Sequence, residues 1–154
     1  PHKMGMVPPP CGVLLLSDKP SVGYEADYLS GGRCLHRSLL GTRQGASVAA
    51  FWAMINYLGV GGYQKVVKKT MEMTDIFLEM IDDIDGVSSV IQPPVNIVGL
   101  KFRNKDARSV QNKLREKGWL VGLGDGYIRV VIMPHHTQEL ISSFVRDLRV
   151  IVNE

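Results

Sequence analysis

Hydrophobic positions recur at helical spacing through the middle of the chain and again near its end. Over residues 46–58 apolar side chains fall on almost every side, which predicts a helix buried nearly all round. The "GVGG" segment at 59–62 ends or kinks this helix. A second helix follows over 63–84, where apolar residues at steps of three and four form one stripe. Another stripe after Thr137, which can cap a helix, predicts a last helix that runs to about residue 151.

Shorter apolar segments predict strands. "GVLLLS" at 12–17 is a continuous apolar run, typical of a strand buried on both faces in a parallel sheet. Three further strands are expected at 95–102, 119–121 and 127–133. The last two are joined by "GLGDG", in which Asp125-Gly126 is a hairpin-turn pair. Asn104 can cap a helix through about residue 117, so the C-terminal half predicts a small α/β unit.

Composition narrows the class of protein. The chain has 154 residues, 45% of them hydrophobic and 21% charged, which suits one ordinary domain with a core. The net charge of +3 is mild and its lysines and arginines are scattered, so we expect solvated helix faces and no nucleic-acid partner. No apolar run reaches the roughly 18 residues of a membrane span. Cys11 and Cys34 are too few for a zinc cluster or disulfide framework, which favours a reducing, cytoplasmic location.

Arg129 is a candidate binding residue within the expected strand "YIRVVIM". Strand alternation places it on the same side as Tyr127, Val131 and Met133. A guanidinium group on a covered face needs an anion. Arg129 is therefore a bidentate clamp for a substrate carboxylate, an edge residue, or one partner of an internal pair with an aspartate.

Two other segments could carry chemistry. In "LLGTRQGA" small residues precede a helix whose first amides can bind an anion, and Thr42 adds a hydroxyl; a simple capped helix start is the alternative. Lys3 lies among small and apolar residues in "HKMGMVPPPCG". A desolvated lysine can act as a nucleophile and form a Schiff base with an aldehyde, whereas a lysine at a chain start is normally solvated.

Four segments in the same order resemble a known family: "HKMGM" followed by "GVLLLSDK", then "YLSGG", "LLGTRQGASVAAFWAMINYLGVGGY" and "IRVVIMPHHT". They resemble the group II pyridoxal-phosphate-dependent amino-acid decarboxylases, above all the archaeal L-tyrosine/L-aspartate decarboxylases. The resemblance covers essentially the whole chain. It implies the α/β fold of aspartate aminotransferase (fold type I), with the end of a large cofactor-binding domain at 1–62. A connecting helix at 63–85 and a complete small C-terminal α/β domain at 86–154 follow.

The resemblance also implies a pyridoxal 5'-phosphate site. Lys3 corresponds to the lysine that forms the Schiff base with the cofactor, and His2 to a residue close to the cofactor phosphate. Thr42 corresponds to the hydroxyl that reaches the phosphate in the partner subunit, because these sites form at the interface of a homodimer. Arg43 supports that turn or touches the substrate.

Activity and substrate binding follow from the same resemblance. The family removes carbon dioxide from an L-amino acid, here tyrosine, aspartate or glutamate, and releases the amine. The segment at 20–40, which has no sustained periodicity, corresponds to a loop over the site that often carries the proton donor. Tyr28 is the candidate for that donor, with Tyr24 in reserve. Arg129 corresponds to the carboxylate-binding arginine of the small domain.

One departure from the family pattern concerns the cofactor pocket. The family has a long stretch before its lysine, which supplies the phosphate loop, the stacked aromatic residue and the aspartate that holds the pyridinium nitrogen. This sequence corresponds to the C-terminal part, so we expect the isolated chain to bind the cofactor poorly and to be inactive. Two alternatives stay open: an aldehyde-lyase similar to sphingosine-1-phosphate lyase, and a non-catalytic truncated fragment that only folds and associates.

Overall fold

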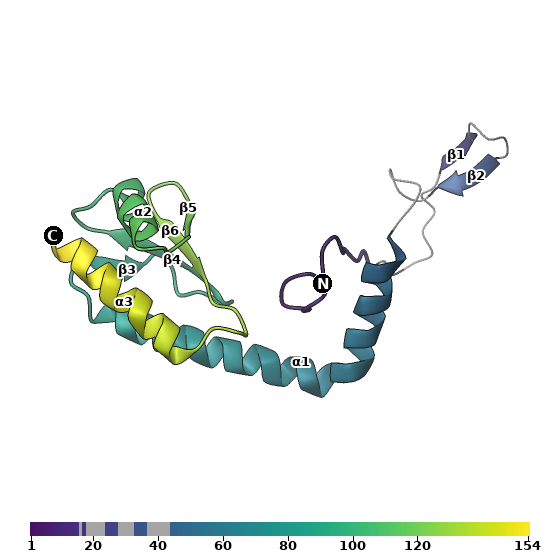
Figure 1. The fold of residues 1–154 in the computed structure, drawn as a ribbon, viewed down its shortest axis with the longest axis horizontal. Coiled ribbons are helices and arrows are strands. Elements are labelled where there is room, and N and C mark those ends of the chain that lie inside the picture. The colour runs from purple at the N-terminus through teal and green to yellow at the C-terminus, as the bar shows by residue number, and fades with distance from the viewer. Residues whose placement is uncertain (16, 18–23, 28–32, 37–43) are drawn as a thin grey trace. The chain divides into compact units, whose positions relative to one another are not determined.

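A computed structural model describes residues 1–15, 17, 24–27, 33–36 and 44–154 (Figure 1). The chain divides into two compact units, an N-terminal unit (Pro1–Val60) and a C-terminal unit (Gly61–Glu154). Helix α1 (Gly45–Asp82) runs from the first unit into the second. Inside it Gly59 is non-helical, with φ 57° and ψ −171°. Because this positive φ suits glycine, the "GVGG" segment interrupts the helix where the sequence predicted a break.

The N-terminal unit contains an antiparallel hairpin of β1 (Tyr24–Asp27) and β2 (Arg33–His36), which no hydrophobic pattern had predicted. The strand expected at "GVLLLS" is not formed by its described residues. Leu14 and Leu15 are 82% and 86% exposed there. A strand must pair its amides and carbonyls with a neighbour. The described strands of this unit, β1 and β2, pair with each other, and neither pairs with this segment.

The first half of α1 also differs from its predicted burial. Val48, Trp52 and Ile55 lie at steps of three and four, and they are 60%, 69% and 44% exposed. The sequence predicted a helix buried nearly all round, and the helix itself is present. Apolar composition shows that a helix face can be covered, but it does not supply the surface that covers it. This face is therefore uncovered in the described structure.

The C-terminal unit is built on an antiparallel sheet of four strands in the order β3-β4-β6-β5. The strands are β3 (Val87–Ser89), β4 (Ile97–Phe102), β5 (Gly122–Leu123) and β6 (Ile128–Val131). Three of them lie in or close to the segments that the sequence predicted, although β5 begins one residue after its expected end. Strand β3, three residues long, is too short for its alternation to be recognised in the sequence.

One core holds this unit together. It lies between one face of the sheet and the helices α1, α2 (Ala107–Glu116) and α3 (Gln138–Asn153). Fully buried members come from every layer: Phe77, Ile81, Val98, Leu100, Leu114, Ile128 and Leu148. The predicted helical stripes and the alternation of β4 are thereby confirmed. Among the described residues no helix is long and apolar enough to cross a membrane.

Helix α2 begins later than the sequence predicted. Thr137 caps α3 as expected, because its hydroxyl accepts a hydrogen bond from the Leu140 amide at 3.3 Å. The cap of α2 is Asp106, whose carboxylate accepts from the Ser109 amide at 3.0 Å. The cap predicted at Asn104 is wrong. The Arg103 amide donates to the carbonyl of Gly86, so the chain is still extending the β3–β4 pairing at that point.

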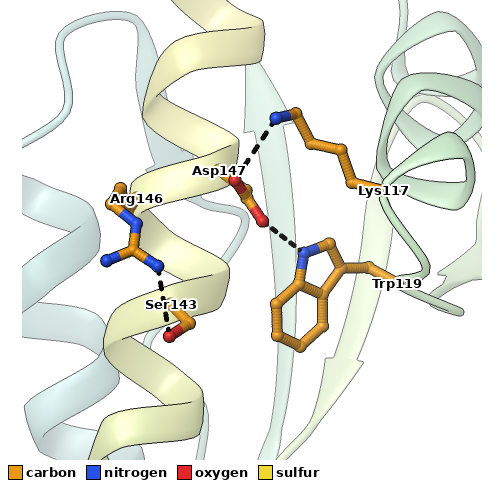
Figure 2. Close-up of polar contacts among 5 residues, drawn as sticks. All are labelled: Lys117, Trp119, Ser143, Arg146 and Asp147. Carbon is orange, nitrogen blue, oxygen red and sulfur yellow. Dashed lines mark hydrogen bonds and ion pairs between the residues drawn. The ribbon is translucent and has the colours of Figure 1, made fainter.

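A polar cluster fastens the segment after α2 to α3 (Figure 2). The Trp119 indole Nε1 donates to Asp147 Oδ2 at 2.8 Å, and Lys117 Nζ lies 3.3 Å from Asp147 Oδ1. These contacts lower the pKa of Asp147, the indole hydrogen bond having the largest effect. The Trp119 ring meets Phe144 edge-on, with centroids 5.4 Å apart. The chain is thus held in place just before it enters β5.

Candidate functional site

Backbone contacts hold the turn that carries Lys3. The Met6 amide donates to the Lys3 carbonyl at 2.8 Å, and the Val7 amide to the Pro1 carbonyl at 3.3 Å. Gly5 lies so close to Pro1 that an added Cβ would sit 2.4 Å from the Pro1 carbonyl oxygen, so the turn requires glycine. The Val7 side chain, 3% exposed, anchors the turn in the unit. A short apolar segment thus presents Lys3 on a defined backbone.

The side chain of Lys3 is exposed. Its amine has no hydrogen-bond or ion-pair partner among the described residues. The desolvation that its apolar neighbours suggested is absent from the described structure, because only Val7 among them is buried, while Met6 and the three prolines are exposed and do not cover the lysine. An uncommitted primary amine is nevertheless what a carbonyl cofactor needs as its attachment point.

His2 lies beside Lys3 in the sequence and lines a hollow of about 620 Å³ at the start of α1. Its Nδ1 is 3.2 Å from the Cys11 carbonyl oxygen; since a carbonyl only accepts, Nδ1 is the donor. Gln44, Ser47 and Val48 border the same hollow. The first turn of a helix carries amides without helical partners, and such ends attract anions. His2 and the start of α1 could therefore face the phosphate of a cofactor.

Three residues expected in the site, Tyr28, Thr42 and Arg43, lie outside the described residues. The reserve candidate Tyr24 belongs to β1 by its backbone. His2 and Lys3 belong to the N-terminal unit and Arg129 to the C-terminal unit. In the described chain no three histidine, cysteine or acidic side chains are grouped to hold a metal ion.

Arg129 lies in β6, opposite Gly99 of β4 and Gly122 of β5. Ile128 before it is fully buried, so the Arg129 side chain leaves the sheet on the face away from the core, and it is exposed. Of the three sequence interpretations, the internal pair with an aspartate is wrong for the described residues, where Arg129 forms no ion pair. It is also no edge residue, because β6 has a strand on both sides at this position.

A cavity of about 380 Å³ opens beside Arg129 where β5 begins. Strand β5 pairs only with Ile128 and Arg129, so the rest of β6 has no described strand on that side. Apolar side chains form most of the cavity wall, including Phe77 of α1 and Phe144 of α3. One cation beside an apolar cavity of this size suits a small carboxylate ligand.

His136 is a further polar residue of this cavity. Its Nδ1 accepts a hydrogen bond from the Met133 amide at 3.2 Å. Burial, and to a smaller extent the neighbouring His135, lowers the pKa of His136 below its usual 6.5. The ring is therefore neutral at pH 7 with its proton on Nε2. The sequence signal was the turn after Pro134, which folds the second histidine back toward the strand end.

Solved structures show which fold the two units belong to. Sphingosine-1-phosphate lyase of Burkholderia pseudomallei matches with a TM-score of 0.74 and 22% identity, over 85% of this chain and 30% of that one. Glutamate decarboxylase of Lactobacillus brevis matches with a TM-score of 0.68 and 15% identity, over 85% of this chain and 33% of that one. At such identities the likeness shows the fold alone. The chain has the α/β fold of the pyridoxal-phosphate-dependent enzymes of fold type I, as predicted.

Curated relatives show which proteins the chain resembles in sequence. A probable L-aspartate decarboxylase of Pyrococcus abyssi is 42% identical over 152 residues, which cover 97% of this chain and 39% of that protein. A probable L-tyrosine/L-aspartate decarboxylase of Methanosphaera stadtmanae is 34% identical over 159 residues, covering 100% of this chain and 40% of that protein. No protein-family profile matches the chain. The chain is similar over almost its whole length to these archaeal amino-acid decarboxylases, and it spans about two-fifths of the length of these relatives.

Proposed function

We propose that the chain takes part in the pyridoxal-phosphate-dependent decarboxylation of a small L-amino acid to its amine and carbon dioxide. The observation that carries the proposal is the 42% identity to a probable L-aspartate decarboxylase over 97% of the chain. Relatives named L-aspartate/L-glutamate and L-tyrosine/L-aspartate decarboxylase leave aspartate, glutamate and tyrosine as candidate substrates.

Lys3 and His2 are the residues that we assign to the cofactor. The exposed Lys3 amine fits an attachment point for an aldehyde, and the His2 imidazole with the start of α1 fits a neighbouring phosphate. When bound, pyridoxal phosphate supplies a ring that accepts the electron pair left as carbon dioxide departs. Thr42, Arg43 and Tyr28 keep their expected roles at the phosphate, at the turn and as proton donor.

Arg129 is the residue that we assign to the substrate. Its planar guanidinium can bind a carboxylate through two parallel hydrogen bonds, which fixes both position and orientation. The exposure of Arg129 and the lack of an acidic partner among the described residues leave it available for this role. Held in this way, the carboxylate would have one fixed orientation in the site.

We propose further that the complete site needs the part of the protein that the relatives possess beyond the matched two-fifths. Lys3, His2 and Arg129 supply the attachment amine, a phosphate contact and a carboxylate contact. The ring-stacking and pyridinium partners are expected from the remaining sequence, and the partner subunit of a homodimer is expected to receive Thr42. The cytoplasmic location stays a prediction.

The assignment of Lys3 can be tested on the 154-residue chain itself. The chain is incubated with pyridoxal phosphate, reduced with borohydride, and mapped by peptide mass spectrometry for the lysine that carries the label. We expect Lys3 to be labelled before the solvated helix lysines such as Lys65 and Lys68. Preferential labelling of those helix lysines would show that Lys3 is not the attachment residue.

Activity is tested by mixing the chain with the separately produced remainder of the protein. Carbon dioxide and amine release is then measured with L-aspartate, L-glutamate and L-tyrosine in turn. We expect activity only in the mixture, and none when Lys3→Ala replaces the natural chain; Lys65→Ala is the matched control and should behave as the wild type. Release of an aldehyde from a phosphorylated amino alcohol would favour the lyase alternative. Absence of all activity in a mixture that forms a complex would favour the non-catalytic one.

A further inference from the structure

Glycine flanks Arg129 on both neighbouring strands. Gly99 of β4 and Gly122 of β5 are its direct partners in the sheet, and together they form a Gly99–Arg129–Gly122 row. Glycine inside a strand weakens it and often marks a place where another group approaches the backbone closely. The contacts on the face of the sheet that carries the Arg129 side chain should therefore explain why both neighbours of Arg129 are glycines.

The space above Gly99 is filled by Tyr127, which precedes Arg129 by two residues. A Cβ on Gly99 would lie 3.2 Å from Tyr127 Cδ2. At Gly124, on the other side of the tyrosine, a Cβ would lie 2.2 Å from Cζ of the same ring. The Tyr127 ring thus lies across two glycines and occupies the β4 side of Arg129.

The space above Gly122 is filled by Arg129 itself. A Cβ on Gly122 would lie 3.1 Å from Arg129 Nε, 3.3 Å from one terminal guanidinium nitrogen, Nη2, and 3.4 Å from Arg129 Cβ. The arginine side chain therefore lies flat over β5 and not upright in solvent. Gly122 and Arg129 both line the 380 Å³ cavity, so the side chain that lies over β5 belongs to a residue of the cavity wall.

We propose that Gly122 is a positioning residue, which lets the Arg129 guanidinium lie across β5 so that it presents its donors to a carboxylate in the adjacent cavity. This inference rests on the carboxylate-binding role proposed for Arg129. Tyr127 closes the β4 side, so a side chain at position 122 would push the guanidinium up and away from the cavity. The ligand class is a small carboxylate whose body can contact apolar side chains, because the wall combines polar surface with apolar side chains such as Phe77 and Phe144.

The contact distances predict a graded effect of side-chain size at position 122. An alanine Cβ needs a shift of a few tenths of an ångström from the end of a flexible arginine side chain, so the fold should tolerate it. A valine at the same position adds two methyl groups and displaces the guanidinium fully. Carboxylate binding should fall in the order glycine, alanine, valine, while the sheet stays formed.

The experiment follows the Arg129 Nε–Hε resonance of the ¹⁵N-labelled full chain by NMR during titration with 3-phenylpropionate. The uncharged 3-phenylpropionamide has the same body and should leave this resonance unmoved. Affinity for 3-phenylpropionate should fall about threefold in Gly122→Ala and about tenfold in Gly122→Val, as expected for distortion and then loss of a charge-assisted contact. Gly61→Ala is the matched control, because its added Cβ meets nothing within 4 Å; it should bind as the wild type does.

The Arg129→Gln variant tests the carboxylate-binding role of Arg129 separately from the role of Gly122. Its binding of 3-phenylpropionate is measured from the backbone amide resonances of the residues that line the cavity. If Arg129→Gln weakens binding about tenfold and both Gly122 variants bind as the wild type does, Arg129 binds the carboxylate without help from Gly122 and the inference is wrong. If Arg129→Gln itself binds as the wild type does, or the wild-type chain does not bind 3-phenylpropionate, the carboxylate role and the inference both fail. The amide spectrum of each variant reports whether it is folded. If Gly122→Val does not fold, the affinity of Gly122→Ala alone tests the inference.

Discussion

Ile128→Ala tests whether the sheet that carries Arg129 is packed as described. The Ile128 side chain is fully buried and lies opposite Leu100 of β4 and Leu123 of β5. The substitution removes three carbon atoms, and at about 0.8 kcal/mol for each buried carbon the transfer loss is about 2.4 kcal/mol. The cavity left in a close-packed core adds to this, so we expect a total destabilisation of about 3–4 kcal/mol.

The loss is measured by thermal unfolding followed through tryptophan fluorescence. Trp52→Phe in all proteins leaves Trp119, which packs on Phe144, as the reporter of the C-terminal unit. In a domain of roughly 60–100 residues each 1 kcal/mol lowers Tm by about 4–8 °C, so Ile128→Ala should lower it by more than about 10 °C.

Ile97→Ala is the matched control for this measurement. Ile97 lies in the neighbouring strand β4, and its side chain is 44% exposed. The same deletion should cost less than about 1 kcal/mol there, since little buried surface is lost. Equal destabilisation by the two substitutions would contradict the core assignment and, with it, the face on which Arg129 is placed.

Three further predictions concern a helix cap and two titrating groups. Asp106→Ala should destabilise the chain by about 1 kcal/mol in urea unfolding because α2 loses its cap, whereas Asn104→Ala should change little. Trp119 lowers the pKa of Asp147, so the stability that this carboxylate adds is present above its ordinary pKa of 3.8 and lost as pH falls through the lower folded value. The advantage of the wild type over Asp147→Asn should therefore shrink in acid, and an advantage that grows there would contradict the contact. Burial lowers the pKa of His136, so its imidazole resonances should titrate below pH 6.5, and stability should fall as pH drops through that midpoint; a midpoint above 6.5 would show that the ring is not buried.

Periodicity predicted the elements of the C-terminal unit well, because their apolar stripes face a core that this unit contains. The stripe over 63–84, the alternation of β4 and the cap at Thr137 all appear where expected. Periodicity failed where local signals compete, as at Asn104 and Asp106. Both residues can cap a helix, and the backbone pairing of Arg103 with Gly86 decides that the later one does.

Some residues of the candidate site were likewise found from the sequence, and others only from the structure. Lys3, His2 and Arg129 were found through a resemblance that the archaeal relatives confirm at the level of the family, while their individual roles stay proposals. His136 and Gly122 could not be found in this way. The place of His136 depends on the turn at Pro134, for which the proline is a sequence signal. The place of Gly122 depends on where β5 begins, which leaves no clear mark in the order of residues.

The sequence by itself determined most elements of the small unit, the break at Gly59 and the resemblance to the archaeal decarboxylases, because each rests on local periodicity, on backbone preference or on residue identity. Only the tertiary structure decided burial. It left "GVLLLS" and the first half of α1 exposed, since an apolar segment becomes core only when another surface covers it. It likewise laid Arg129 over Gly122, because strand register sets which residues of different strands meet.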